Sequence, residues 1–275
     1  MVGLFLIVAV SADVLAPHGP QDRSRQHEWI AATGAGSPPT ITNQNLPPSR
    51  WHWLGTDSHE HDVLSTVMYG SRLSLLAGLI SITLAITLGA PAGAIAGYRG
   101  GWADAVIMRG IDIMLAFPSI LIALLTVSSL GAGWSAVIIA VGLINVPVFA
   151  RQVRATVLTV RELEYVAASR AMGATPLYIL SRVILPSLMS PVIVLATLGL
   201  GSAILEVAGL SFLGIAGDPT IPEWGSMLSE AREHLHDSAW PALAPGIAIS
   251  LSVLGFNLLG DGLRDALDPR LELQR

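Results

Sequence analysis

The chain contains no cysteine and no lysine, because all fifteen of its basic residues are arginine. The absence of cysteine excludes disulfides, thiolate metal sites and cysteine nucleophiles. The absence of lysine excludes a Walker A phosphate loop, whose lysine must reach the β- and γ-phosphates of the nucleotide. If ATP drives this protein, a different polypeptide must therefore bind it. The formal net charge of −5 argues against nucleic acid as a partner.

Charged residues are also scarce. They make up 13% of the 275 residues, whereas hydrophobic residues make up 52%. Soluble domains carry roughly 25% charged residues, so this chain has too few to cover a surface that faces water. The mean hydropathy is +0.61, and the apolar residues are concentrated in long blocks. This composition is typical of a protein that crosses a lipid membrane several times.

Four long stretches carry no charged residue and together predict five transmembrane helices. They are residues 73–98, 113–150, 183–205 and 238–260. The second stretch, as one helix, would be about 57 Å long, far more than a ~30 Å hydrocarbon core requires. Gly131, Gly133 and Trp134 lie near its middle and favour a turn at the membrane interface, which predicts a helical hairpin.

Residues 1–12 are apolar too, but a dozen residues span only about 18 Å as a helix. One interpretation is the core of a signal peptide, although a basic leading region is missing. We favour the alternative that residues 1–16 are a first transmembrane helix that lacks its beginning. The chain then continues with an extracytoplasmic segment, 17–67, a transmembrane core, 68–263, and a cytoplasmic tail, 264–275.

Arginine placement predicts the orientation of these helices, because cytoplasmic loops are enriched in basic residues. With the N-terminus inside, ten arginines fall on the cytoplasmic side and five on the outer side. The C-terminus is then cytoplasmic, and all seven histidines lie in the outer loops. We therefore expect an all-α polytopic membrane protein with six transmembrane helices, the first of them shortened.

The segment 161–186 lies between two of these spans and predicts a helix, a turn and a second helix. Glu164 lies in the first turn, where the helix dipole favours an acidic side chain. Gly173 can take the left-handed position that follows a helix. Thr175 can cap the next helix, with Pro176 at its first position. The first helix also has a face of small side chains that another protein can approach closely: Ala167, Ala168, Ser169 and Ala171.

This segment resembles the EAA loop of binding-protein-dependent ABC importer permeases. The pattern of that loop is Glu-Ala-Ala, three residues, Gly, nine residues and Ile-x-Leu-Pro. Residues 167–169, Ala-Ala-Ser, precede Gly173 with the same spacing, and residues 183–186, Val-Ile-Leu-Pro, follow nine residues later. The chain departs from the pattern with Ala167 for Glu, Ser169 for Ala and Val183 for Ile.

In that family the helix of the loop docks in a groove of the ATPase. The resemblance therefore implies a coupling role for Arg161, Glu164, Ala167, Ala168, Ser169, Gly173, Leu185 and Pro186. Because position 167 lacks the glutamate of the pattern, no specific salt bridge is expected from it. The alternative is an ordinary amphipathic cytoplasmic loop.

Other motifs resemble the second permease of dipeptide and oligopeptide importers. They are Leu-Gly-Thr-Asp at 54–57, Tyr-Gly-Ser-Arg-Leu-Ser-Leu at 69–75, Gly-Leu-Ser-Phe-Leu-Gly at 209–214, Trp-Gly at 224–225 and Asn-Leu-Leu-Gly-Asp-Gly-Leu-Arg-Asp-Ala-Leu-Asp-Pro at 257–269. The resemblance implies the type I ABC importer permease fold in the bacterial inner membrane. It also implies a homologous permease, two ABC ATPases that bind ATP and Mg²⁺, and an extracytoplasmic peptide-binding protein as partners. Lipid surrounds the chain, which itself would hold no cofactor.

Three residues are candidates for the translocation path: Asn145, Ser202 and Glu206. An acidic residue at membrane depth is costly and is often functional, and Glu206 could recognise the amino group of a peptide. The alternative, which we favour, is a structural hydrogen bond that holds its helix. Arg109 and Asp112, three residues apart, are expected to form an ion pair at the start of the third span.

Residues 60–62, Glu-His-Asp, stand where the dipeptide-importer pattern has Gly-Arg-Asp after Leu-Gly-Thr-Asp, and with His59 before them they form the polar stretch His-Glu-His-Asp. A metal site here would need side chains that converge on one ion together with further ligands. We favour an exposed polar loop, and we expect the same of His234 and His236.

The motifs thus predict a peptide-importer permease without catalytic residues of its own. Importers of nickel chelates, haem or glutathione have the same architecture, so these substrates stay open. An intramembrane enzyme would need histidine, aspartate or serine to converge inside the spans, yet every histidine lies outside them. A stand-alone secondary transporter would need several intramembrane charges for ion coupling, and Glu206 is the one acidic residue placed deep in a span.

Overall fold

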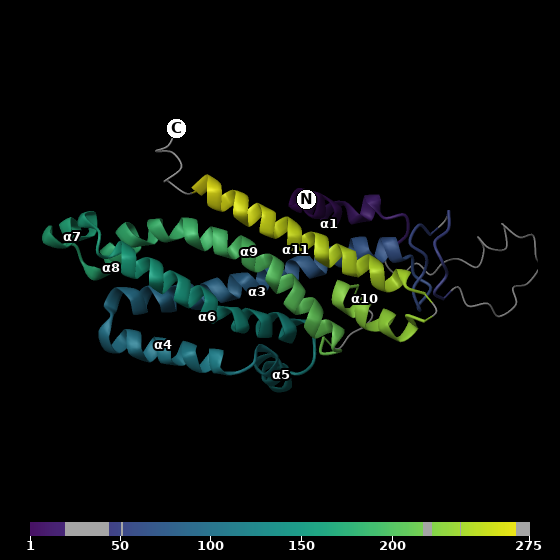
Figure 1. Cartoon of the computed structure of the whole chain (residues 1–275), viewed down its shortest axis with the longest axis horizontal. Coiled ribbons are helices and arrows are strands. Elements are labelled where there is room, and N and C mark those ends of the chain that lie inside the picture. The colour runs from purple at the N-terminus through teal and green to yellow at the C-terminus, as the bar shows by residue number, and fades with distance from the viewer. Residues whose placement is uncertain (20–43, 51, 217–221, 237, 268–275) are drawn as a thin grey trace, which may run out of the picture. The chain divides into compact units, whose positions relative to one another are not determined.

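The computed structural model describes residues 1–19, 44–50, 52–216, 222–236 and 238–267, which form helices joined by short loops (Figure 1). The helices in chain order are α1 (Val2–Leu15), α3 (Val63–Arg99), α4 (Gly101–Ala116), α5 (Ser119–Leu130), α6 (Trp134–Val160), α7 (Glu164–Ala171), α8 (Pro176–Tyr178), the π-helix η1 (Ile179–Ile184), α9 (Leu185–Phe212), α10 (Trp224–Ala231), the 3₁₀-helix η2 (Arg232–His234) and α11 (Trp240–Leu267). The described residues contain no β-strand, so the expected all-α fold is confirmed.

Within the described residues, four helical stretches are long and apolar enough to cross a membrane: Val63–Arg99, Trp134–Val160, Pro176–Phe212 and Trp240–Leu267. The helices α4 and α5 qualify as a fifth span only when taken together, and they are bent by 95° at their junction. The shorter apolar helix α1 has 14 residues. The chain is therefore a multi-pass membrane protein.

The bend between α4 and α5 corrects the expected hairpin over 113–150. The turn expected at Gly131 to Trp134 is present, because α5 ends at Leu130 and α6 begins at Trp134. The first arm, however, is not one straight helix. Phe117 has an extended backbone, with φ −93° and ψ 139°, because the ring of the following Pro118 disfavours the helical conformation in the residue before it.

The chain divides into two compact units. The first comprises Met1–Ala77, Ala132–Trp134 and Ile204–Gly255. The second comprises Gly78–Gly131, Ser135–Ala203 and the residues from Phe256 onward.

In the first unit, α10 is held by a buried carboxylate at its N-terminus. Glu223 accepts hydrogen bonds from the amides of Gly225 and Ser226, both at 3.0 Å, and from the hydroxyl of Ser74 at 3.3 Å. The fully buried Trp224 donates its ring N–H to the carbonyl oxygen of Val67 at 3.0 Å. These bonds satisfy helix-end amides that would otherwise be left without partners away from water.

In the second unit, α3 and α6 approach closely along a stripe of glycines. Gly89, Gly93 and Gly97 are spaced four residues apart on α3, so they lie on one helix face. A Cβ atom at Gly93 would overlap the carbonyl oxygen of Ala150, and one at Gly97 would lie 2.9 Å from the Cβ of Val157. Small residues at this spacing let two membrane helices pack backbone against backbone.

Two ion pairs join α4 to α6 in the same unit. Arg154 binds both carboxylate oxygens of Asp104, at 2.5 and 2.6 Å. Arg151 binds Asp112 at 2.7 Å. The expected pairing of Asp112 with Arg109 is wrong, because Arg151 on the facing helix takes that carboxylate.

Candidate functional site

The segment 161–186 folds into the helix, turn and helix that its residues predict. The helix α7 ends in a Schellman motif, in which the amide of Gly173 donates to the carbonyl oxygen of Arg170 at 3.0 Å and that of Ala174 donates to Ser169 at 3.1 Å. Gly173 has a φ of +82°, a conformation that glycine adopts without steric cost. The predicted left-handed position after α7 is therefore confirmed.

The second helix begins as expected and then departs from α-helical geometry. The hydroxyl of Thr175 accepts a hydrogen bond from the amide of Tyr178 at 3.4 Å, and Pro176 occupies the first turn. A π-helix, η1, follows directly, and at its end the amide of Leu185 bonds to the carbonyl oxygen of Leu180, five residues back. Because Pro186 has no amide hydrogen, the helix cannot form a regular bond there. Sequence reasoning did not anticipate this π-helix, although the Leu-Pro pair inside an apolar helix marks its place.

One face of α7 is anchored to the rest of the second unit. Val166 is fully buried in an apolar cluster that includes Val157, Ile179 and Ile184. The hydroxyl of Tyr165 lies 3.3 Å from that of Ser187 at the start of α9. These contacts tie α7 both to the end of α6 and to the beginning of α9.

Two arginines add contacts with the end of α3. The guanidinium of Arg170 lies over the ring of Tyr98, 5.8 Å from its centroid. Arg161 donates to the carbonyl oxygen of Gly97 at 2.6 Å and pairs with Glu162 at 2.9 Å. The hydrogen bonds of Arg161 are therefore made within the chain, which supports a role in holding α7 in place.

The opposite face of the segment is exposed and carries large apolar and small side chains. Met172 and Leu177 are 81% and 74% exposed. Ala167 and Ala168 are also exposed, with Ser169 half-buried beside them. A helical hairpin anchored on one side and bearing apolar and small residues on the other is suited to fit a groove of another protein. The exposed residues of this docking face are Leu163, Glu164, Tyr165, Ala167, Ala168, Ala171, Met172, Leu177 and Tyr178.

The three candidate path residues differ in their surroundings. Asn145 is buried in α6 and donates to the carbonyl oxygen of Val141 at 3.0 Å. Ser202 is exposed and Glu206 half-buried, one turn apart on α9. The second unit has a groove of about 450 Å³, and none of these three residues lines it. Its lining residues are Gln152, Ser190, Pro191, Val194, Leu195, Leu198, Arg264 and Leu267.

The polar loop at 59–62 is not uniformly exposed, which corrects the sequence-based expectation. His59 pairs with Glu230 at 2.5 Å, and His61 pairs with Asp57 at 3.3 Å. Asp62 is only 2% exposed and faces two histidines from other parts of the first unit. Sequence reasoning missed this cluster, because its three members are far apart in the chain and carry no common motif.

The comparison with known proteins decides the family. Residues 89–273 match the family described as the binding-protein-dependent transport system inner membrane component. The chain belongs to this family. The matched region contains the whole segment 161–186. The spacing from Gly173 to Leu185 and Pro186 therefore lies in the part of the chain that matches the family.

Relatives of this permease cover most of its length. It is 47% identical over 231 residues to the dipeptide transport system permease protein DppC of Alkalihalophilus pseudofirmus, covering 84% of this chain and 76% of that one. It is 46% identical over 228 residues to the glutathione transport system permease protein GsiD of Pectobacterium atrosepticum, covering 83% and 76%.

Solved transporter structures share the fold of this permease. A chain of the methionine ABC transporter MetNI in an inward-facing conformation aligns with a TM-score of 0.60 at 21% identity, covering 74% of this chain and 96% of that one. A chain of an amino acid ABC transporter crystallised with histidines aligns with a TM-score of 0.58 at 15% identity, covering 74% and 95%. These likenesses confirm the ABC importer permease fold.

Proposed function

We propose that this permease imports peptides as one transmembrane subunit of an ATP-driven complex. It would form the translocation path with a homologous permease and receive its substrate from an extracytoplasmic peptide-binding protein. Two separate ABC ATPases would bind ATP and Mg²⁺, since the chain has no lysine for a Walker A loop. The complex would lie in the bacterial inner membrane, with the segment 161–186 and the C-terminus in the cytoplasm.

The observation that carries this proposal is the docking face on 161–186. It lies in the hairpin that connects α6 to α9, and that hairpin has the residue spacing of the EAA loop. Exposed apolar side chains of this size, Met172 and Leu177 above all, are costly to leave in water. A groove on the ATPase would cover them.

The anchored face of the hairpin gives a route for movement from the ATPase to the spans. Val166 packs in one apolar cluster with residues of α6 and with Leu188 on α9. Because packed interiors resist compression, displacement of α7 would move the cytoplasmic ends of both spans. The π-helix at Ile179–Ile184 has weaker constraints than a regular α-helix and is a natural place for the second span to adjust.

The relatives support a small peptide as substrate. Dipeptides and glutathione share a free amino group, a carboxylate and a peptide backbone, and this chain is 47% identical to a permease named for dipeptides and 46% identical to one named for glutathione. Glutathione is therefore the second candidate. Uptake of labelled dipeptide and of labelled glutathione should be compared in proteoliposomes that contain the whole complex and its binding protein. Uptake that proceeds without ATP or without the ATPases would contradict the proposal and favour a stand-alone transporter.

Two adjacent substitutions test the docking face. Ala168→Asp should place a negative charge in the proposed contact between the docking face and the ATPase. Because burying an unpaired carboxylate costs roughly several kcal/mol, this variant should uncouple ATP hydrolysis from uptake. Ala167→Glu introduces the same charge on the neighbouring exposed residue, where the EAA pattern itself has glutamate, and should leave coupling intact. Both variants should remain in the membrane at normal levels. Normal peptide uptake by Ala168→Asp would overturn the docking assignment.

A further inference from the structure

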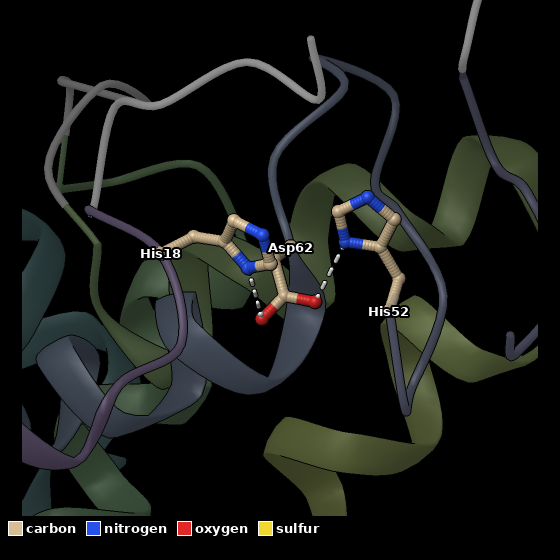
Figure 2. A group of neighbouring side chains, drawn as sticks. All are labelled: His18, His52 and Asp62. Carbon is tan, nitrogen blue, oxygen red and sulfur yellow. Dashed lines mark hydrogen bonds and ion pairs between the residues drawn. The ribbon is translucent and has the colours of Figure 1, made fainter. Parts of the chain in front are cut away.

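His18, His52 and Asp62 meet in the first unit, although they come from three separate stretches of the chain. Figure 2 shows both imidazole rings turned toward the carboxylate of Asp62, one on each of its oxygens. Nδ1 of His52 lies 3.0 Å from Oδ1, and Nδ1 of His18 lies 3.8 Å from Oδ2. The two rings are 4.9 Å apart between centroids and tilted by 32°. Each residue offers one ligand atom, and these three atoms lie within 4.8 Å of one another.

We propose that His18, His52 and Asp62 bind one divalent transition-metal ion, with Zn²⁺ as the representative species. Two imidazole nitrogens and one carboxylate oxygen are a donor set that proteins use for Zn²⁺ and for other first-row metals. Three protein donors leave room for water or an exogenous ligand on the ion. A site of this composition favours borderline metals over Ca²⁺ or Mg²⁺, which prefer oxygen ligands alone.

The spacing of the donors suits such an ion after His18 moves closer to the other two. Bonds of 2.0–2.2 Å in tetrahedral geometry place two donors roughly 3.3 Å apart. The separation between His52 and Asp62 is already within a few tenths of an ångström of that value. His18 faces the other carboxylate oxygen, and the three ligand atoms lie within 4.8 Å of one another, so His18 must approach by up to roughly 1.5 Å to reach tetrahedral spacing. It lies in the loop after α1, where its side chain is 25% exposed. A metal ion between these atoms replaces the hydrogen shared by His52 and Asp62.

The backbone around the three ligands is already positioned for this contact. Ser65 donates to Oδ2 of Asp62 through its amide at 2.8 Å and through its hydroxyl at 2.6 Å, and the same hydroxyl oxygen accepts the amide of His18 at 3.1 Å. The hydroxyl oxygen of Ser49 accepts a hydrogen bond from the amide of His52 at 3.1 Å, and the amide of Ser49 donates one to the carbonyl oxygen of His52 at 2.7 Å. Partners of this kind orient ligands and raise metal affinity.

A hydrogen-bonded helix cap alone does not account for the cluster. Asp62 caps the start of α3 through Ser65, and His52 shares a hydrogen with its other oxygen, so these residues are satisfied without a metal ion. Nδ1 of His18 is different, because it is buried and makes no hydrogen bond with any described residue. Its contact with the carboxylate of Asp62, at 3.8 Å, is too long for a hydrogen bond. Buried polar atoms without a hydrogen bond are uncommon, and a metal ion gives this nitrogen a ligand bond.

The charge state of the carboxylate also fits. Burial by itself raises the pKa of Asp62, but the hydrogen bonds with His52 and Ser65 outweigh it and leave the pKa below its ordinary value. The carboxylate is therefore ionised at neutral pH, as a metal ligand must be. The ion would fasten the loop after α1 to the turn before α3, in addition to the hydrogen bond that the amide of His18 donates to Ser65.

The test is zinc binding to the purified full-length chain in detergent, measured by competition with a chromogenic chelator and by elemental analysis. One Zn²⁺ per chain is expected. His18→Gln and His52→Gln should each weaken binding at least about 100-fold, the upper end of the loss seen when partners of metal ligands are replaced. His236→Gln, an exposed histidine of the same unit, is the matched control and should change the affinity less than about twofold. Substoichiometric binding, or equal binding by the His18 variant and the control, would overturn the proposal.

A second measurement separates binding from folding. Zn²⁺ should raise the melting temperature of the wild-type chain and of the control, because a ligand that binds the folded state stabilises it. It should not raise that of His18→Gln, because that variant lacks one of the three ligands. An identical rise in all three proteins would also overturn the site. These outcomes do not depend on transport, so they can fail while the peptide-import proposal stands.

Discussion

The carbonyl oxygen of Ser169 accepts a hydrogen bond from the amide of Ala174 at 3.1 Å, which closes the last turn of α7 around Gly173. No atom lies within 4 Å of the position that a Cβ at Gly173 would occupy. The requirement for glycine is therefore conformational and does not come from close packing. The direction in which the chain leaves α7 depends on this one left-handed residue.

Replacing Gly173 with alanine should destabilise the hairpin by about 1–2 kcal/mol, the cost of a left-handed backbone for an ordinary residue. Gly173→Asn should cost less, because asparagine tolerates this conformation better. Thermal unfolding in detergent and ATP-coupled uptake would measure both effects. Gly110→Ala, in the interior of α4 with no neighbour within 4 Å of the added methyl group, should show no loss. Equal effects of alanine at both sites would contradict the assignment.

The close contact of α3 with α6 makes a different prediction for Gly93. Gly93→Ala should lower the stability of the second unit by about 1–3 kcal/mol, because the added methyl group overlaps the backbone of Ala150. Gly262→Ala on α11 adds the same group in open space and should be neutral or slightly stabilising. A melting temperature that is unchanged in Gly93→Ala would show that the two helices do not pack at this distance.

Removal of the buried carboxylate at α10 should also be costly. Glu223→Gln keeps the shape of the side chain but turns an amide group toward backbone N–H donors, leaving one donor without an acceptor. The expected loss is about 1–3 kcal/mol, measured by thermal unfolding. Glu233→Gln, an exposed residue of the same unit, should leave stability within ~0.5 kcal/mol of the wild type. A loss of similar size in both variants would refute the role given to Glu223.

The two ion pairs between α4 and α6 should differ in strength. The side chains of Arg154 and Asp104 are 33% and 20% exposed, whereas those of Arg151 and Asp112 are 55% and 52% exposed. Water screens the second pair more strongly, so its coupling should be about 0–1 kcal/mol. Double-mutant cycles with the neutral amide replacements should give a larger coupling for the first pair, which is bidentate. The reverse order would contradict this interpretation.

The parts of the fold that follow from local chemistry were predictable. Long apolar runs identified the spans, and the turn at Gly131 to Trp134 follows from its glycines. Gly173, Thr175 and Pro176 predicted where α7 ends and the next helix begins, since each acts through its own backbone. The bend at Pro118 was open to the same reasoning, because the restriction before proline is local too.

Partners of charged groups were harder to predict from spacing. Arg109 and Asp112 satisfy the helical rule for an ion pair, yet Asp112 pairs with Arg151 on another helix. The spacing along one helix indicates which residues of that helix can meet. It does not indicate whether an arginine on a facing helix competes for the same carboxylate. The roles proposed for Asn145, Ser202 and Glu206 stay predictions, because a path shared with the proposed second permease would depend on contacts from another chain.

The sequence by itself determined that this chain crosses a membrane, that it cannot bind ATP through a Walker A loop, and where the hairpin of residues 161–186 begins and turns. These properties depend on composition and on neighbours within a few residues. Tertiary structure alone decided that His18 and His52 meet Asp62, that Arg151 takes Asp112, and which side chains of 161–186 face outward. Such contacts join residues dozens of positions apart, and only the packing of helices brings those residues within bonding distance.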